Sequence, residues 1–291
     1  MYVHGLNLMQ KINSKNKYRD EESVKYLQEI LPVYNEWKKK NEELRGPYSE
    51  VTEEDIRIIE ERVSLFNNYK DFIDQQMYAE KFDSRSNLHS SVLEEFIYYL
   101  FRDIAKEYNE EALVGKSHAF KDIFFNAESY RDMLDEPNLK IETKDHDFVI
   151  GSNIIANFSV QGSEKIEHKE LHIPAVAIEC KTYIDKTMLE ASSTAAEQLK
   201  MKNPNAVYII VAERVKLSEA VNFQKYKVDQ IYIFRKQKNT DREYTFVESY
   251  IKNPIYTDVV AHLFQYVREH LTVNWEGNLT DGIERGFLIN R

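Results

Sequence analysis

The sequence predicts a mixed α/β fold, with a central sheet flanked by helices and an N-terminal helical region in front of it. Two observations predict this fold. Residues 90–271 alternate between amphipathic helix patterns and short apolar strand patterns, which is typical of a sheet packed between helices. The first 85 residues, by contrast, are highly charged and carry apolar residues at helical spacing. A chain of 291 residues can bury the core of one large domain or of two small ones.

The individual elements follow from the spacing of apolar residues along the chain. Amphipathic spacing predicts helices over residues 22–41, 51–69, 90–108, 187–201 and 258–271. Short apolar runs predict strands over residues 120–126, 147–150, 174–181, 207–212 and 230–234. Residues 152–172 are polar and are expected to form a hairpin or a loop. We therefore expect a helical accessory or dimerisation region (1–85), a core (86–240) and a C-terminal helix with a tail (241–291).

Composition limits the class of protein. The hydrophobic fraction is 42%, and 8 glycines and 6 prolines are few for this length, so we expect a compact, helix-rich protein. A single cysteine excludes an internal disulfide and a cysteine-based zinc site, and it suits a reducing cytoplasm. No signal peptide or membrane-spanning run is evident, so no membrane association is expected. The net charge of −10 argues against a protein that coats DNA through bulk charge, but it does not exclude a nuclease.

An acidic residue opens one predicted strand, and a Glu-x-Lys sequence ends another. Asp147 precedes the apolar residues 148–150, and Glu179 and Lys181 end the strand over 174–181. Alternate side chains of a strand share a face, so Glu179 and Lys181 point the same way. Buried charges are costly unless they are paired or bound to a metal ion. The pattern therefore favours a divalent-metal site beside a phosphodiester, although ordinary strand-end charges at a solvated edge would give the same pattern.

Neighbouring residues compete for places in this site. Asp145 shares a face with Asp147, but Asp147 adjoins the apolar run, where a strand-end ligand is held in place. In the helix over 90–108, Glu94 lies at the edge of the apolar stripe and Glu95 on its far side. Glu94 is therefore the helical glutamate expected to reach an interior metal site, although it could equally be a solvated boundary residue.

Several segments of the chain together resemble a known family. They read FDSR (82–85), LEEF (93–96), KDHDFVIG (144–151), IPAVAIECK (173–181) and IYIFR (231–235), followed by helical residues 188–200 within the same stretch. These segments resemble the BbvCI-type family of Type II restriction endonucleases over about residues 80–240. The resemblance implies a restriction-endonuclease-like PD-(D/E)xK fold, with residues 86–240 as the nuclease core. His146 stands where the motif name has proline, a position that tolerates variation.

The resemblance also implies roles for the motif residues. Asp147, Glu179 and the backbone carbonyl of Cys180 would bind Mg²⁺, which prefers oxygen ligands. Lys181 would orient or deprotonate the attacking water, and Glu94 would hold a metal-bound water or a second metal. The substrate would be double-stranded DNA with a short specific sequence. The chain would work as a homodimer or as a heterodimer with a related subunit, in a host that carries a cognate DNA methyltransferase.

The sequence also offers candidates for contacts to DNA. Basic residues near the motif segments are the candidates, and ordinary solvated side chains are the alternative for each: Arg85, Lys116, Lys121 and Lys186. Three other functions stay open. A repair or junction nuclease of the same fold would cut branched DNA regardless of sequence, a DNA-binding subunit would keep the fold without cleavage, and a helical interaction protein would use the first 85 residues.

Overall fold

The computed structural model of the chain describes residues 2–82, 86–239, 251–275 and 279–286. Its centre is a five-stranded sheet with the order β1-β2-β3-β4-β5. The pairs β1–β2 and β2–β3 are antiparallel, whereas β3–β4 and β4–β5 are parallel. The sheet is therefore mixed, as the sequence predicts. The strands are β1 (Leu113–Phe125), β2 (Leu139–Phe158), β3 (Glu167–Asp185), β4 (Val207–Lys216) and β5 (Gln230–Ile233).

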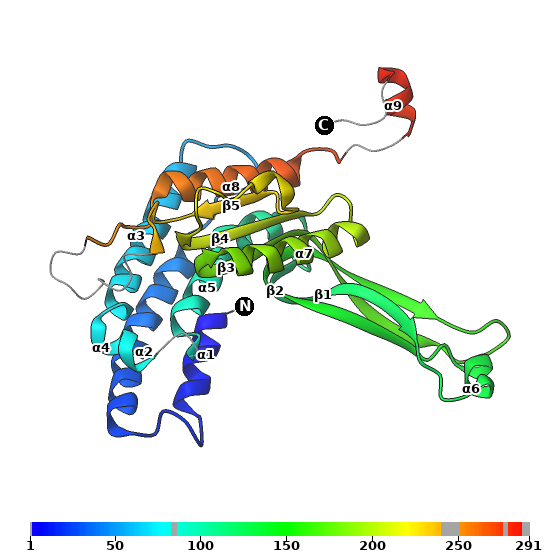
Figure 1. Cartoon of the computed structure of the whole chain (residues 1–291), viewed down its shortest axis with the longest axis horizontal. Helices are drawn as coiled ribbons and strands as arrows, with labels where there is room; N and C mark the ends of the chain where they lie inside the picture. Colours follow the sequence, from blue (N-terminus) through cyan, green and yellow to red (C-terminus); the bar gives the residue numbers. More distant parts are fainter. Residues whose placement is uncertain (1, 83–85, 240–250, 276–278, 287–291) are drawn as a thin grey trace.

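Helices cover both faces of the sheet and form the N-terminal region (Figure 1). They are α1 (Val3–Ile12), α2 (Glu21–Glu43), α3 (Asp55–Ile73), α4 (Gln76–Lys81), α5 (Leu88–Tyr108), α6 (Tyr130–Asp135), α7 (Lys186–Lys202), α8 (Thr257–Thr272) and α9 (Leu279–Arg285), with a 3₁₀ turn at Phe223–Lys225. No helix among the described residues is both long enough and apolar enough to span a membrane.

Strand alternation sorts the core into two layers. Ile178 and Ile209 face a large cluster that includes side chains of α2, α3, α5 and α8. Ala177 and Ile210, their neighbours in sequence, face a smaller cluster with α7. Because the middle of the sheet is buried on both faces, β3 and β4 are nearly continuous apolar runs, as is usual for covered strands. The same alternation decides which side chains of β3 are available for chemistry.

The outer parts of β1, β2 and β3 extend from the body as an arm that ends in α6 (Figure 1). β2 pairs with β1 over residues 139–151 and with β3 over residues 148–158, so the two hairpins share this one strand. The hairpins contact each other, since Ser117 Oγ lies 2.8 Å from His172 Nδ1. At the base of the arm, a Cβ atom on Gly151 would lie 2.2 Å from the carbonyl oxygen of Ile173, so only glycine fits there without a shift of the backbone.

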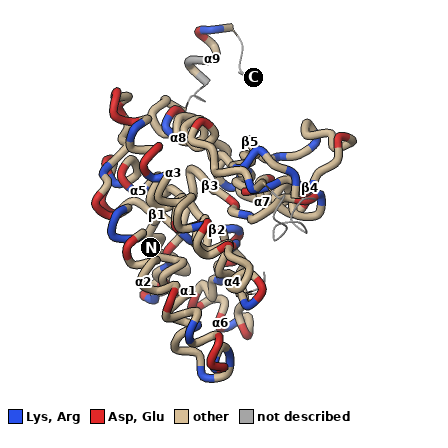
Figure 2. Tube along the Cα trace, turned by 90° about the vertical axis from the view of Figure 1, so that its left-hand side faces the viewer, with Lys and Arg blue, Asp and Glu red and all other residues tan. Residues whose placement is uncertain are grey.

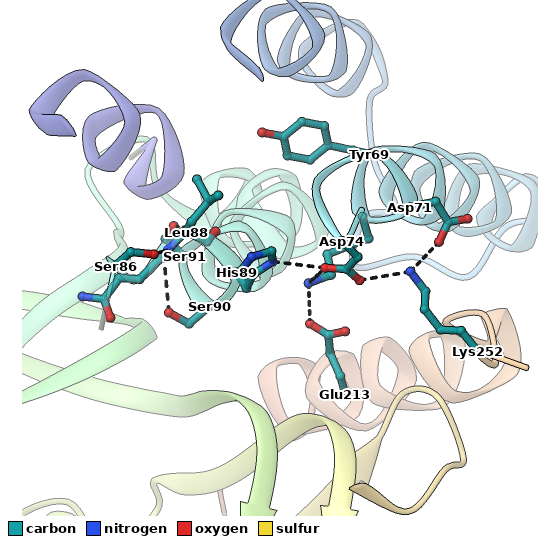
Figure 3. Close-up of polar contacts among 12 residues, drawn as sticks. Tyr69, Asp71, Asp74, Ser86, Leu88, His89, Ser90, Ser91, Glu213 and Lys252 are labelled. Carbon is teal, nitrogen blue, oxygen red and sulfur yellow. Dashed lines mark hydrogen bonds and ion pairs between the residues drawn. The ribbon is translucent and has the colours of Figure 1, made fainter. Parts of the chain in front are cut away.

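A buried network of charged groups connects α3, α5 and the sheet (Figure 3). Lys70 Nζ of α3 lies 2.9 Å from Glu213 Oε1 of β4 and 3.2 Å from Asp74 Oδ1. Glu213 also accepts a hydrogen bond of 2.9 Å from Arg235 Nε. His89 Nδ1, near the start of α5, lies 3.1 Å from Asp74. Buried charges are tolerated only when they are paired, and these residues pair with one another across three elements.

Most predicted elements are confirmed, and the differences lie in the arm and at the ends of the chain. The strand predicted over residues 120–126 begins earlier, at Leu113, and the strand predicted over 147–150 extends from Leu139 to Phe158. Polar residues 152–172 form an antiparallel hairpin between β2 and β3, which is one of the two forms expected for them. The tail beyond α8, for which no element was expected, contains α9. The division into three regions remains a prediction, and one apolar cluster extends from α1 to the sheet.

Candidate active site

Three charged side chains meet where β2 and β3 run side by side. Asp147 is on β2, and Glu179 and Lys181 are on β3. Lys181 Nζ lies 2.6 Å from Glu179 Oε1 and 3.6 Å from Asp147 Oδ2. The backbone N–H of Cys180 donates a hydrogen bond of 2.9 Å to Asp147 Oδ2. The structure therefore brings together the two acids and the lysine that the sequence analysis selected.

The alternation of β3 explains this arrangement. Ile178 and Cys180 point into the large core cluster, and the Cys180 side chain is 2% exposed. Glu179 and Lys181 point the other way and keep 20% and 29% of their side chains exposed. The charged groups thus lie partly buried at the edge of the core, where solvent and a ligand can still reach them. Electrostatic interactions are stronger there than in bulk water.

The electrostatics of the group show an excess of negative charge. Burial raises the pKa of Asp147, repulsion from Glu179 raises it further, and Lys181 opposes both effects. Burial by itself lowers the pKa of Lys181, but the two carboxylates outweigh burial and raise it. Lys181 therefore carries its positive charge. An additional cation would relieve the repulsion between the two carboxylates.

Glu94 approaches this group from α5. Burial raises its pKa to about 7, with the charge of Asp147 as the second cause and Lys116 opposing both. Lys116 Nζ of β1 lies 3.4 Å from Glu94 Oε2, and 43% of its side chain is exposed. Glu95, by contrast, is turned away and fully buried, and accepts a hydrogen bond of 2.9 Å from Tyr34 OH. Of the two adjacent glutamates, Glu94 is the one that faces Asp147.

The structure adds one residue that the sequence analysis missed. Tyr208, on β4, donates a hydrogen bond of 3.2 Å from its hydroxyl to Glu179 Oε2. It is 1% exposed, and its ring meets the ring of His146 edge to face at 5.6 Å. Burial and the charge of Glu179 raise the pKa of Tyr208, so the phenol keeps its proton. A tyrosine in the apolar run 207–212 was the available clue, because a buried hydroxyl needs a partner.

Other predicted residues lie apart from this group. Asp145, the competitor of Asp147, is 68% exposed and pairs with His118. Lys121 pairs with Glu142 on the arm. Lys186, at the start of α7, is 66% exposed and lies 3.8 Å from its partner Glu190. Of the predicted DNA contacts that the structure describes, only Lys116 lies at the carboxylate group, and Arg85 falls outside the described residues.

The carboxylates suit a hard cation, although they are few. Within residues 2–82, 86–239, 251–275 and 279–286, no group of three or more His, Cys, Asp or Glu side chains is arranged to hold a metal ion. Mg²⁺ does not need such a cage, because it is usually bound through one or two carboxylates together with waters and substrate phosphates. Asp147 and Glu179 provide that number of carboxylates, and the partial exposure of both leaves room for water.

Comparisons with known proteins identify the fold and the family of the chain. The family described as Bpu10I restriction endonuclease matches residues 85–288. A solved structure titled "native BbvCI A2B2 tetramer at low resolution" superposes with a TM-score of 0.66 at 19% sequence identity, over 94% of this chain and 98% of that chain. That similarity shows a shared fold. No curated protein sequence matches the chain. Because the family match covers most of the sequence, the chain belongs to the Bpu10I restriction endonuclease family and is a Type II restriction endonuclease or one subunit of such an enzyme.

Proposed function

We propose that this chain hydrolyses phosphodiester bonds of double-stranded DNA at a short specific sequence, with Mg²⁺ as cofactor. One observation carries the proposal. In this chain, Lys181 Nζ lies close to the carboxylates of two neighbouring strands. It is 2.6 Å from Glu179 on β3 and 3.6 Å from Asp147 on β2. A phosphodiester hydrolyses very slowly without help, so most of the rate enhancement must come from charge neutralisation and positioning.

Asp147, Glu179 and the carbonyl of Cys180 would hold the metal ion. When bound, Mg²⁺ would neutralise the phosphate and lower the pKa of a bound water. The hydrogen bond from Cys180 N–H fixes one oxygen of Asp147, and the hydroxyl of Tyr208 fixes one oxygen of Glu179. Asp147 therefore keeps its second oxygen, Oδ1, for the ion, whereas Oε1 of Glu179 lies 2.6 Å from Lys181 Nζ and would be shared between that ammonium group and the ion.

The remaining side chains would act on the water and on the phosphate. Lys181, as an ammonium group, would orient the attacking water and stabilise the charge that develops on the phosphate. Glu94 would accept a hydrogen bond from a water in the site. Its pKa of about 7 suits a group that exchanges a proton near neutral pH, and its charge interacts with that of Asp147 on β2. Lys116, beside Glu94 and partly exposed, would contact a DNA phosphate.

We further propose that the chain works in an assembly with a related subunit or a second copy of itself. The BbvCI structure of the same fold is titled as an A2B2 tetramer. A specific duplex cut needs both strands to be hydrolysed, and two active sites in one assembly provide that. A host with such an endonuclease would carry a cognate DNA methyltransferase to protect its own chromosome.

Metal dependence and sequence specificity can be tested together. We expect the purified chain, with its related subunit where one exists, to cut a long, sequenced, unmethylated DNA into discrete fragments with Mg²⁺ and to leave it intact with EDTA. Gel electrophoresis and sequencing of the fragment ends would give the recognised site. A smear without fixed ends, or cutting only of branched DNA, would favour a repair or junction nuclease. Cleavage that persists in EDTA would contradict the role of Mg²⁺, and bound but uncut DNA would indicate a non-catalytic binding subunit.

A further inference from the structure

Helix α1 is fixed to the helix that carries Glu94. The backbone N–H of His4 donates a hydrogen bond of 2.8 Å to Glu95 Oε2, and its ring nitrogen Nδ1 lies 2.9 Å from Ser91 Oγ. His4 and Glu95 are both fully buried. Satisfied buried polar networks of this kind specify one arrangement of the elements that they join. Helix α1 is therefore held in a defined position beside Glu94, because Glu94 is the sequence neighbour of Glu95, to which α1 is hydrogen-bonded.

The other end of α1 is tied down as well. Lys11 is 5% exposed, and its Nζ donates hydrogen bonds to the carbonyl oxygen of Ser86 and, at 2.5 Å, to Asn7 Oδ1. Ser86 lies just before the start of α5. Two separate contacts thus attach α1 to α5, one near each of its ends. The proposed catalytic mechanism uses none of these groups.

The anchored helix lines the edge of the candidate active site. A recess of about 250 Å³ lies between α1, α5 and β1, and its lining includes Asn7 and Gln10 of α1 together with Glu94 and Lys116. Gln10 is exposed. A ligand that reaches Glu94 and Lys116 therefore comes within reach of the polar face of α1.

The chain that follows α1 carries unpaired positive charge. Residues 13–19 contain three cations, Lys15, Lys17 and Arg19, and no acid, in a protein with a net charge of −10. Lys15, Lys17 and Arg19 are exposed, and within the part of the chain that the structure describes none of them forms an ion pair. Acidic and basic residues are otherwise interspersed along the trace (Figure 2). On α2, exposed lysines pair with glutamates one turn away, as the contacts Lys25–Glu29, Lys39–Glu43 and Lys40–Glu36 show.

We propose that α1 and residues 13–19 form one wall of the DNA-binding surface. This inference rests on the proposed DNA cleavage at Asp147, Glu179 and Lys181. Gln10 contacts the sugar–phosphate backbone beside the cleaved bond, and the cations of residues 13–19 neutralise phosphates farther along the duplex. Contacts to the DNA backbone fix the register of a protein on the duplex and supply most of its sequence-independent affinity. An acidic protein therefore needs a local cationic surface near its active site, and the exposed cations of residues 13–19, which follow the anchored α1, provide one.

The triple variant K15A/K17A/R19A tests the loop. Its binding to a fluorescent, unmethylated duplex of mixed sequence is measured by anisotropy over a series of NaCl concentrations, with Ca²⁺ in place of Mg²⁺. The whole chain is used, in assembly with its related subunit where that forms. We expect the affinity at low salt to fall at least ~10-fold. The magnitude of the slope of log affinity against log salt should decrease by about 2–3, because each lost phosphate contact reduces that magnitude by about 0.9. The melting temperature should not change, since the three side chains are exposed.

Two further variants complete the test. K25A/K39A/K40A removes the same charge from α2, where each lysine is already paired, and should leave the salt slope unchanged. Gln10→Glu places a carboxylate beside the DNA backbone and should weaken binding several-fold. An unchanged salt slope in K15A/K17A/R19A would show that residues 13–19 do not contact DNA. Unchanged affinity in Gln10→Glu would show that α1 does not. Failure of the wild-type protein to bind the duplex would instead contradict the proposed function itself.

Discussion

Replacement of Glu179 or Lys181 by alanine should lower the rate of DNA cleavage by about 10³-fold or more, because each change removes a charge that the transition state needs. Glu179→Ala removes a proposed metal ligand and leaves Lys181 without its partner at 2.6 Å. Lys181→Ala removes the ammonium group that would face the phosphate. DNA binding should survive in both variants, since backbone contacts elsewhere supply the affinity. Cleavage of a plasmid with Mg²⁺ and binding of a duplex with Ca²⁺ measure the two effects separately.

A surface variant provides the matched control for these changes. Glu190, on α7, is 52% exposed and pairs only weakly, at 3.8 Å, with Lys186. Glu190→Ala should therefore cut DNA at the wild-type rate and melt at the wild-type temperature. The assignment of the site fails if purified, folded Glu179→Ala or Lys181→Ala retains the wild-type rate.

Replacement of Glu213 by alanine should cost about 3–5 kcal/mol of the free energy of unfolding, because it leaves buried cations without their partner. Glu213 is 1% exposed, and its carboxylate lies 2.9 Å from both Lys70 Nζ and Arg235 Nε. Arg235 is fully buried and cannot turn to water. Unfolding by urea, followed by circular dichroism, measures the loss, again with Glu190→Ala as the control. A loss below ~1 kcal/mol would show that the network contributes little to stability.

The same network gives the protein a defined sensitivity to acid. Burial by itself raises the pKa of Glu213, but Lys70 and Arg235 outweigh burial and lower it from 4.5 to about 2. A folded-state pKa below the unfolded value means that the stabilisation is fully present above about pH 4.5 and is lost as the pH falls toward 2. The free energy of unfolding of the wild-type protein should therefore fall over this window, and Glu213→Ala should show a shallower fall. Equal slopes would contradict this origin of the acid sensitivity.

The candidate site could be predicted because its logic is local. Strand alternation places Glu179 and Lys181 on one face from their spacing alone. The apolar run after Asp147 marks the point where β2 enters the core, although the strand itself begins earlier, at Leu139. Tyr208 could not be placed in this way, because its contact with Glu179 depends on the parallel pairing of β3 with β4. The pairing of strands distant in sequence is set by the whole fold and leaves no local pattern.

The arm and the burial of Glu95 on α5 also depend on contacts between distant parts of the chain, which local patterns do not show. Residues 139–146 carry charged side chains at 140, 142, 144 and 145. Because this part of β2 is mostly exposed to solvent, it lacks the apolar pattern from which a strand is predicted. Helical spacing places Glu95 on the side away from the apolar stripe, yet the residue is fully buried because α1 and α2 cover it. A stripe defines one covered face of a helix, but it does not show what covers the others.

The substitution Asp147→Asn tests the central claim most directly, because the amide keeps the size of the side chain and an acceptor for Cys180 N–H while it removes the charge. The measurement is the single-turnover rate of cleavage, with Mg²⁺, of a duplex that carries the recognised sequence. The predicted result is a variant that melts like the wild type and binds the duplex, but does not cut the DNA strand that the wild-type active site of this chain cuts. Cleavage of that strand by Asp147→Asn at the wild-type rate would show that Asp147, Glu179 and Lys181 are not the active site.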